Sequence, residues 1–364
     1  MKALLRALAT GLAAALVASA ALAPQAAEGA SAVLSKDGTL YEVFSTTFEK
    51  VDPSAAGAFE ANQTVLALRI TPTKGEPHLE LVEGTLDPDD EWGAEVEYDE
   101  STHAVFVAYT KSQGFYANIH FAARTAENTW FEGGFLASPG LYFSMNPRLV
   151  VTRQKYRLLD ADGATVEKWR SILSIVWWEA TASSQGRIAF VFLEDGEIRT
   201  DDTIPYNLNE LVGSHGRTLF EGLPLSAYAY PAIQRDPKTN GGVLVSFADL
   251  VSLKQVGVGL TFPDDLTSLP ASSSTSRSAF ARGHNPIGRT MFMNRLPVQI
   301  DTPAPVATSI APTSGMPVFY WSEGSSLHVL RGDAVEATPI RIPLRADFPL
   351  ERAVSTVRDM AEKE

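Results

Sequence analysis

The chain has 364 residues, of which 45% are hydrophobic and 20% are charged, and this composition excludes a mainly disordered protein. It contains no cysteine, which excludes disulfides, thiolate metal sites and cysteine nucleophiles. The 43 acidic side chains outnumber the 30 basic ones. The resulting net charge of -13 argues against nucleic-acid binding, because nothing offsets the repulsion from phosphates.

Residues 1–29 have the layout of a secretory signal peptide. Lys2 and Arg6 precede an apolar run of roughly 16 residues, and small residues suited to signal cleavage follow that run. A membrane anchor is the alternative, but the run is short for a spanning helix of about 20 residues. We expect an exported bacterial protein, periplasmic or secreted, with no transmembrane segment after cleavage.

Residues 30–348 contain recurrent apolar runs rich in Val, Ile, Phe, Tyr and Trp, which are typical of β-strands. Five of these runs are each followed by a turn and a second apolar run. This pattern predicts five strand–turn–strand units with the same internal order. The first runs of the five pairs are residues 65–70, 104–109, 172–178, 243–247 and 318–321.

A further strand candidate precedes several of these units and begins at a proline or a glycine. Proline is tolerated at the first residue of a strand, where its missing N–H costs no ladder hydrogen bond. We therefore expect each of these short motifs to open a strand. The motifs are Trp92-Gly93, Asn146-Pro147, Tyr230-Pro231 and His284-Asn285-Pro286.

Together these patterns predict an all-β fold, a β-propeller of five blades or, alternatively, six. Residues 37–44 are a strand candidate that would close the ring beside residues 327–330. A pair of β-sandwiches is the alternative architecture. In residues 349–364, apolar side chains recur at helical spacing, which predicts a short C-terminal helix that caps the domain.

The order of residues 146–151, a hairpin and then residues 174–179 resembles the blades of sialidase-like and other secreted bacterial propellers. Thr129-Trp130 is similar to the end of a degenerate Asp-box, and Arg341-Ile342-Pro343 is similar to the sialidase arginine motif. In that family the arginine motif precedes the first blade, whereas here it lies near the C-terminus. The resemblance implies a propeller over residues 60–335 and does not imply glycan cleavage.

One segment of this acidic chain is basic. Residues 266–300 contain no acidic side chain. Guanidinium groups suit carboxylates, sulfates and phosphates because they offer paired donors. If the segment covers the channel mouth, it could hold an acidic glycan; alternatively, it pairs with the protein's own carboxylates. Its candidate ligand-binding residues are Arg282, His284, Asn285, Arg289 and Arg295.

Residues 87–100 have the opposite bias, with eight acids and no base. Oxygen ligands gathered in a loop could bind calcium, and Asp87, Asp89 and Asp90 are the candidates. Solvated surface charge is the alternative. Apart from this possible calcium, the sequence implies no cofactor.

Two further groups of residues could carry function. Positions just before a strand-opening proline, or before the matching Gly93, can face the funnel of a propeller. The candidates for its lining are His284, Asn285, Asn146, Tyr230 and Trp92. Glu179 and Glu323 follow tryptophans at matching ends of two strands, where their carboxylates could serve as acids or as sugar-binding partners. Packing or ordinary loop hydrogen bonding is the alternative in each case.

Three functions follow from this pattern. The first is a non-catalytic, exported propeller that binds a glycan, a peptide or a protein partner through its funnel face. The second is a glycan-active hydrolase or lyase on the same scaffold, and the third is a structural module of the cell envelope. No nucleophile elbow, phosphate-binding loop or zinc-type histidine pair is present in the sequence.

Overall fold

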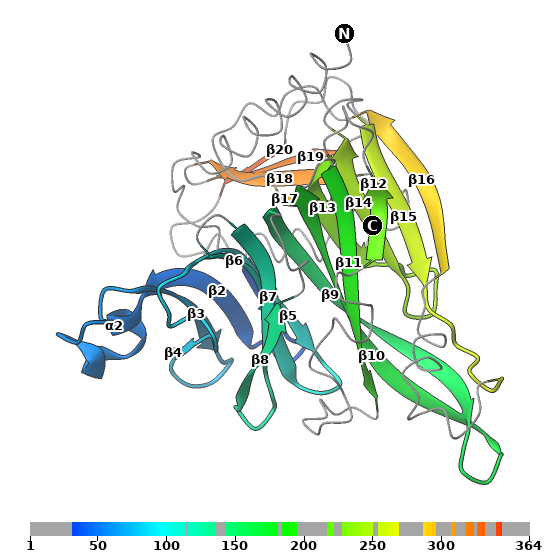
Figure 1. Cartoon of the computed structure of the whole chain (residues 1–364), viewed down its shortest axis with the longest axis horizontal. Helices are drawn as coiled ribbons and strands as arrows, with labels where there is room; N and C mark the ends of the chain where they lie inside the picture. Colours follow the sequence, from blue (N-terminus) through cyan, green and yellow to red (C-terminus); the bar gives the residue numbers. More distant parts are fainter. Residues whose placement is uncertain are drawn as a thin grey trace.

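A computed structural model describes most of the chain between Ser31 and Pro343 (Figure 1). The predicted signal peptide and C-terminal helix therefore lie outside the described residues. The residues described are 31–113, 116–135, 143–180, 184–194, 217–221, 228–249, 254–268, 287–295, 307–310, 317–323, 326–331 and 340–343.

The described residues are almost entirely β structure. Two short helical segments, the α-helix α2 (Phe48–Val51) and the 3-10 helix η1 (Pro53–Ala55), lie between the second and third strands. No helix among the described residues is long and apolar enough to cross a membrane. The all-β prediction is therefore confirmed.

The first half of the described chain forms three sets of four strands. The first set is a four-stranded sheet, β1 (Ser31–Leu34), β2 (Leu40–Thr47), β3 (Thr64–Thr71) and β4 (His78–Leu81). The second contains β5 (Asp90–Asp99), β6 (Ala104–Gln113), β7 (Tyr116–Arg124) and β8 (Trp130–Phe135). The third contains β9 (Phe143–Leu159), β10 (Thr165–Ala180), β11 (Ser184–Glu194) and β12 (Arg217–Glu221).

The second half forms two more four-stranded sheets. One contains β13 (Tyr228–Arg235), β14 (Val243–Asp249), β15 (Lys254–Thr261) and β16 (Ile287–Arg295). The other contains β17 (Ala307–Ile310), β18 (Pro317–Glu323), β19 (Ser326–Arg331) and β20 (Ile340–Pro343). We call these five consecutive sets of four strands units 1 to 5.

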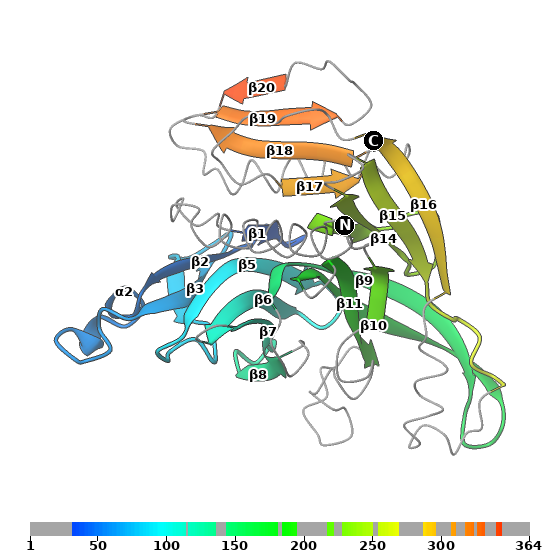
Figure 2. The same ribbon diagram turned by 45° about the horizontal axis from the view of Figure 1, so that its top comes forward.

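Each unit is an antiparallel meander in which every strand pairs with the next one along the chain. Units 2 and 3 join into one eight-stranded sheet through a single parallel bridge between Ala117 of β7 and Phe143 of β9. In Figure 2 the units follow one another in chain order, from the blue sheet at the left to the orange sheet at the top.

The core lies between successive units. One apolar cluster joins units 1 and 2, with Leu68 on one side and Val107 on the other. A second joins units 2 and 3, with Phe106 against Trp177, and a third joins units 3 and 4. Units 2 and 3 therefore bury both faces, unlike the sheets of a sandwich, which bury one face each. Burial on both faces explains why their strands are continuous apolar runs rather than alternating ones.

The first strands of the units form a series. β1 contacts β5, β5 contacts β9, β9 contacts β13, and β13 contacts β17. β1 and β5 run in the same sense, because Ser31 contacts Glu95 and Lys36 contacts Glu100. β9 follows that sense too, because Arg148 contacts Glu95, and Ser171, the partner of Arg153, contacts Ser101. The starts of these three strands therefore lie toward one end of the series, and the turns that follow them lie toward the other.

The five predicted hairpins are all present as β3–β4, β6–β7, β10–β11, β14–β15 and β18–β19. The prediction of a common internal order is wrong for the first pair, because residues 65–70 lie in the third strand of unit 1. In the other four units the corresponding run is the second strand. Unit 1 differs because β2 provides its own central apolar strand.

Two other predictions about strand order are wrong. Residues 37–44 do not pair with residues 327–330: β2 lies between β1 and β3, and β19 lies between β18 and β20. Ile287, after the His284 motif, begins the fourth strand of unit 4 rather than a first strand.

Candidate functional site

The first strands of units 2, 3 and 4 share a β-bulge at equivalent positions. In each strand two residues lie opposite one residue of the second strand, and that residue is a fully buried aromatic. The pairs are Gly93-Ala94 opposite Tyr109, Asn146-Pro147 opposite Trp177 and Tyr230-Pro231 opposite Phe247. Three of the four predicted motifs are thus equivalent, but they lie inside strands rather than opening them, and the His284 motif is not one of the three.

The backbone explains why these residue types occupy the bulges. Gly93 has φ of +61° and Asn146 has φ of +55°, a left-handed region that glycine enters freely and asparagine tolerates better than most residues. Bulges bend a strand and redirect its side chains. Here the Asn146 Oδ1 lies 3.9 Å from the position that a Cβ of Gly93 would occupy, so the bulges of units 2 and 3 adjoin.

The side chains that follow the bulges join four first strands. Glu95 of β5 accepts a hydrogen bond from Ser31 Oγ of β1 at 2.9 Å and forms an ion pair with Arg148 of β9 at 2.7 Å. Two residues further along β5, Glu97 accepts from Arg235 of β13 at 3.2 Å. Arg235 also donates to the Val151 carbonyl at 2.8 Å. The series of first strands is therefore held by carboxylate–guanidinium pairs.

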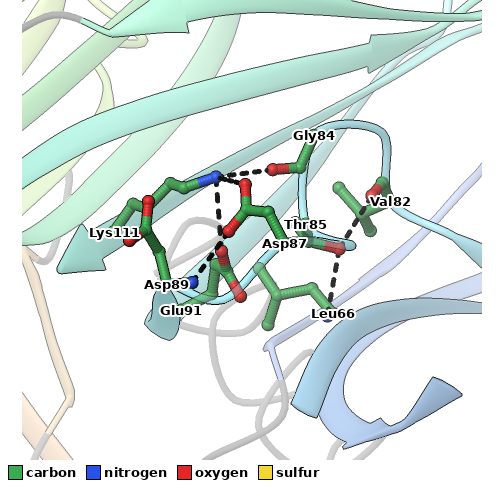
Figure 3. A network of polar contacts seen from close by, with 8 residues as sticks. All are labelled: Leu66, Val82, Gly84, Thr85, Asp87, Asp89, Glu91 and Lys111. Carbon is green, nitrogen blue, oxygen red and sulfur yellow. Dashed lines mark hydrogen bonds and ion pairs between the residues drawn. The ribbon is translucent and has the colours of Figure 1, made fainter. Parts of the chain in front are cut away.

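A second polar group lies at the same end, between units 1 and 2 (Figure 3). Lys111, near the end of β6, donates to the Gly84 carbonyl at 2.8 Å and contacts the Asp87 carboxylate. Its Nζ lies 3.5 Å from Glu91 Oε1. The loop between β4 and β5 therefore covers the ammonium group. Within this loop the Asp89 N–H donates to Asp87 Oδ1 at 3.0 Å. We call Asp87, Asp89, Glu91 and Lys111 the Lys111 cluster.

Burial sets the protonation of this cluster. Glu91 is 2% exposed, and neither of its oxygens accepts a hydrogen bond within the described part of the chain. Burial raises the pKa of Glu91 to about 8, although the charge of Lys111 opposes the shift. Burial alone would lower the pKa of Lys111, but the Asp87 carboxylate, helped by Glu91, outweighs that effect and raises it.

His120 borders the cluster from β7. Its ring stacks on Tyr109 at 5.7 Å between centroids, and it lies opposite Tyr109 in the β6–β7 ladder. Burial lowers the pKa of His120 to about 4, and the positive charge of Lys111 lowers it further. At neutral pH this end of the unit 1–unit 2 interface therefore holds a charged lysine, a neutral histidine and a largely protonated glutamic acid.

The calcium candidates do not converge on one point. Asp87 contacts the Lys111 ammonium, which provides the neighbouring positive charge, and Asp90 is exposed at the start of β5. Across the residues with described side chains, no group of three His, Asp or Glu residues is arranged to hold a metal ion.

The other predicted residues divide into two groups. Trp92 and Asn146 lie at the adjoining bulges and are partly exposed, and the backbone of Tyr230 occupies the matching bulge of β13. Glu179 is buried and accepts from Ser144 Oγ at 3.5 Å. Glu323 lies at the matching end of β18, opposite Ser326. The backbones of Arg289 and Arg295 lie in β16, whereas Arg282, His284 and Asn285 lie outside the described residues.

Sequence reasoning missed the pairing of Glu91 with Lys111 and of Glu95 with Arg148. Each pair joins residues from strands whose register no local pattern reveals. The one available signal was Lys111 itself, a lysine directly after a run of buried strand residues.

Comparison with known proteins assigns this chain to no family. No family model matches the chain, and no curated protein matches it. A Hadza microbial sialidase has a TM-score of 0.40 at 10% identity, covering 87% of this chain and 58% of the sialidase. The polysaccharide lyase Uly1 has a TM-score of 0.39 at 9% identity, with coverage of 88% and 69%.

The lectin of Aleuria aurantia has a TM-score of 0.36 at 7% identity, covering 88% of this chain and 81% of the lectin. The chain spans less than three fifths of the length of the sialidase and of an exo-β-1,3-galactanase from Phanerochaete chrysosporium, at 58% and 56%. These similarities assign no residue a role.

Proposed function

We propose that this protein is a five-bladed β-propeller that binds a glycan, without cleaving it, at the bulged end of its first strands. Three features support the architecture. The strands fall into five consecutive four-stranded meanders, units 1 to 4 pack face to face in order, and the first strands contact one another in series. Radial repetition of small antiparallel sheets has these properties, and units 5 and 1 would close the ring.

The observation that carries the proposed function is the pair of adjoining bulges. They place the partly exposed indole of Trp92 and the amide of Asn146 at the same end, beside the Glu95–Arg148 ion pair. Small-molecule sites combine apolar and aromatic surface with a few fixed polar groups. An indole offers flat apolar surface to a sugar ring, and amide and guanidinium groups match its hydroxyls.

The same geometry favours binding over catalysis. Hydrolysis of a glycosidic bond commonly requires two carboxyl groups that face each other across the scissile bond. Glu95 is paired with Arg148 beside the bulges, Glu97 is paired with Arg235 further along the strands, and Glu179 is buried against Ser144. These carboxylates hold strands together, and we assign them structural roles.

One observation favours a glycan hydrolase or lyase as the second candidate. Glu91 has a pKa raised to about 8, and strongly perturbed carboxyl groups are often found at catalytic sites. A protonated Glu91 could donate a proton to a leaving group. Its burial under the β4–β5 loop separates it from substrate, so this candidate requires that loop to open.

The apolar segment before Ala23 and the glycan-binding role together lead us to propose export to the periplasm or the medium. The proposed partner is a glycan outside the cytoplasm. The basic segment at residues 266–300 would add affinity for an acidic glycan if it borders the bulged end.

Calorimetric titration with a panel of neutral trisaccharides tests the function. The key variant is Asn146→Gly, which removes the amide and retains a residue that adopts the left-handed backbone. Asn128→Gly is the matched control, because Asn128 also has a left-handed backbone, with φ of +64°, but lies in the β7–β8 turn. We expect Asn146→Gly to weaken binding about ten-fold, the effect of about one lost hydrogen bond, and Asn128→Gly to leave it unchanged.

Two results would contradict the proposal. If no trisaccharide binds, the glycan-binding function is wrong. If a trisaccharide is cleaved and Glu91→Gln abolishes cleavage, the enzyme is the correct candidate.

A further inference from the structure

The paired strands β9 and β10 extend beyond the other sheets as a two-stranded arm, which ends at the turn of residues 160–163 (green, lower right in Figure 1). This arm belongs to the end of the molecule opposite the bulges. One of its faces exposes Arg153, Lys155 and Arg157 on alternate residues of β9. On β10, Trp169 lies opposite Lys155 and is 48% exposed. The face therefore combines three cations with one aromatic ring in a protein of net charge -13.

The arm is held by neighbouring turns. The Lys155 N–H donates to Asn240 Oδ1 at 3.0 Å, and Asn240 Nδ2 donates back to the Lys155 carbonyl at 2.7 Å. The Arg157 N–H donates to the Asp264 carbonyl at 2.8 Å, and the Arg157 carbonyl accepts from the Leu266 N–H at 2.7 Å. Because the backbone is anchored on both sides of Tyr156, the exposed face is pre-organised, which reduces the entropy cost of binding.

Arg153 differs from the other stacked arginines. Its guanidinium lies over the Trp169 ring, with Cζ 4.7 Å from a ring centroid. Arg69 stacks on Phe44 at the same distance but lies 3.7 Å from the Glu42 carboxylate. Arg170 stacks on Tyr156 and donates to Gln154 and Pro263. Within the part of the chain that the structure describes, Arg153 has no such carboxylate or carbonyl partner.

Stacking leaves the donors of Arg153 available. A guanidinium group carries its N–H donors in its own plane, where they match the two oxygens of a carboxylate. The ring of Trp169 fixes this plane through a cation–π contact. The flanking cations are engaged in exposed ion pairs, Lys155 with Glu167 at 2.6 Å and Arg157 with Asp265 at 2.9 Å. Such pairs are weak and can exchange partners with an incoming anion.

We propose that this arm is a binding site for an acidic sugar residue, such as a uronic acid within a glycan chain. Arg153 binds the carboxylate, Trp169 holds Arg153 and offers its exposed surface to the sugar ring, and Lys155 supplies a second positive charge. The site is separate from the bulged end and does not depend on the function proposed there.

The observations favour one acidic sugar over a nucleic acid. Single-stranded nucleic acids bind to series of aromatic rings along a continuous positive groove. The arm offers one exposed ring and, among the described residues, one cation without a carboxylate partner. That set of groups matches one carboxylate and one ring.

Titration with trigalacturonate tests the site. We expect Arg153→Ala to weaken binding ten-fold or more, as expected for the loss of a charge-assisted contact. Trp169→Ala should weaken it similarly, and Trp169→Phe should restore part of the affinity. Arg69→Ala is the matched control, since it removes a stacked arginine elsewhere, and Asn146→Gly should leave this binding unchanged. Equal thermal unfolding temperatures of the variants would show that the fold is retained.

Several results would overturn the site. Unchanged binding in Arg153→Ala would do so, as would equal binding of the neutral trisaccharide cellotriose at the arm. Binding of oligothymidine that is lost in Arg153→Ala, without binding of trigalacturonate, would replace the glycan with a nucleic acid. If Asn146→Gly weakens trigalacturonate binding and Arg153→Ala does not, the bulged end holds the acidic sugar and the arm does not.

Discussion

Glu91→Gln is the substitution whose effect on stability the structure defines best. The change keeps the shape of the side chain and removes its ability to ionise. In the folded protein the pKa of Glu91 is raised from 4.5 to about 8, because the carboxyl group is buried. The folded state therefore retains a proton that the unfolded chain releases, so rising pH favours unfolding.

The size of the effect follows from this shift. Each pH unit between the two pKa values costs the folded state about 1.4 kcal/mol. Glu91 contributes no penalty below pH 4.5, and its penalty grows until the pH passes 8. Between pH 5 and pH 8 the free energy of unfolding should fall by about 3 to 4 kcal/mol through this one group. Glu91→Gln should remove that part of the pH dependence.

Urea unfolding followed by tryptophan fluorescence at pH 5, 6, 7 and 8 measures the effect. The relevant quantity is the difference in the free energy of unfolding between Glu91→Gln and the wild type, because the titration of all other groups cancels. We expect this difference to increase in favour of the variant by about 3 to 4 kcal/mol across the range. Asp90→Asn is the control, because the neighbouring Asp90 is exposed at the start of β5.

A pH-independent difference would refute this reasoning. It would mean that Glu91 is ionised throughout, with Lys111 outweighing the cost of burial. An equal effect of Asp90→Asn would mean that the general negative charge of residues 87–100 sets the pH dependence.

Three further predictions concern single residues. Burial lowers the pKa of His120 to about 4, so the unfolded chain binds a proton at this residue before the folded protein does. The free energy of unfolding is therefore unaffected by His120 above pH 6.5 and decreases as the pH falls towards 4. His120→Phe should reduce this decrease by about 3 kcal/mol in unfolding titrations. Asn146→Val should cost about 1–3 kcal/mol, because a β-branched residue is strained at φ of +55°, and Asn146→Gly should be nearly neutral in the same urea assay. Gly242→Ala should lower the free energy of unfolding by about 1–3 kcal/mol, because the new Cβ would lie 2.6 Å from the Leu260 carbonyl oxygen. Gly259→Ala is its control, because the nearest atom there lies at 3.5 Å. Equal thermal unfolding temperatures for the two variants would contradict this prediction.

The strands could be predicted from the sequence because units 2 and 3 bury both faces of their sheets. That burial requires continuous runs such as residues 104–109 and 172–178, which are visible without knowledge of the fold. The position of a strand within its unit could not be predicted, because it depends on which strands the loops of unequal length bring side by side. Residues 37–44 show this: residues 40–44 form a strand as expected, but residues 37–39 lie in the preceding turn, and the strand pairs within unit 1.

The bulges were partly predictable. Trp92-Gly93, Asn146-Pro147 and Tyr230-Pro231 stand out as interruptions of β-type sequence, although the sequence suggests strand starts at these points. The Lys111 cluster was not predictable, because Glu91 and Lys111 meet only through the register of β5 on β6. The arm site required knowledge of which face of β9 is exposed.

Hydrogen–deuterium exchange tests the proposed glycan site most directly. The neutral trisaccharide that binds most tightly in calorimetry would be added, and amide exchange would be compared with and without it. We expect protection around Trp92 to Glu95 and Ser144 to Arg148, the two segments that carry the adjoining bulges. Binding without protection of either segment, or protection confined to residues 153–169 of the arm, would contradict the claim that the bulged end binds the glycan.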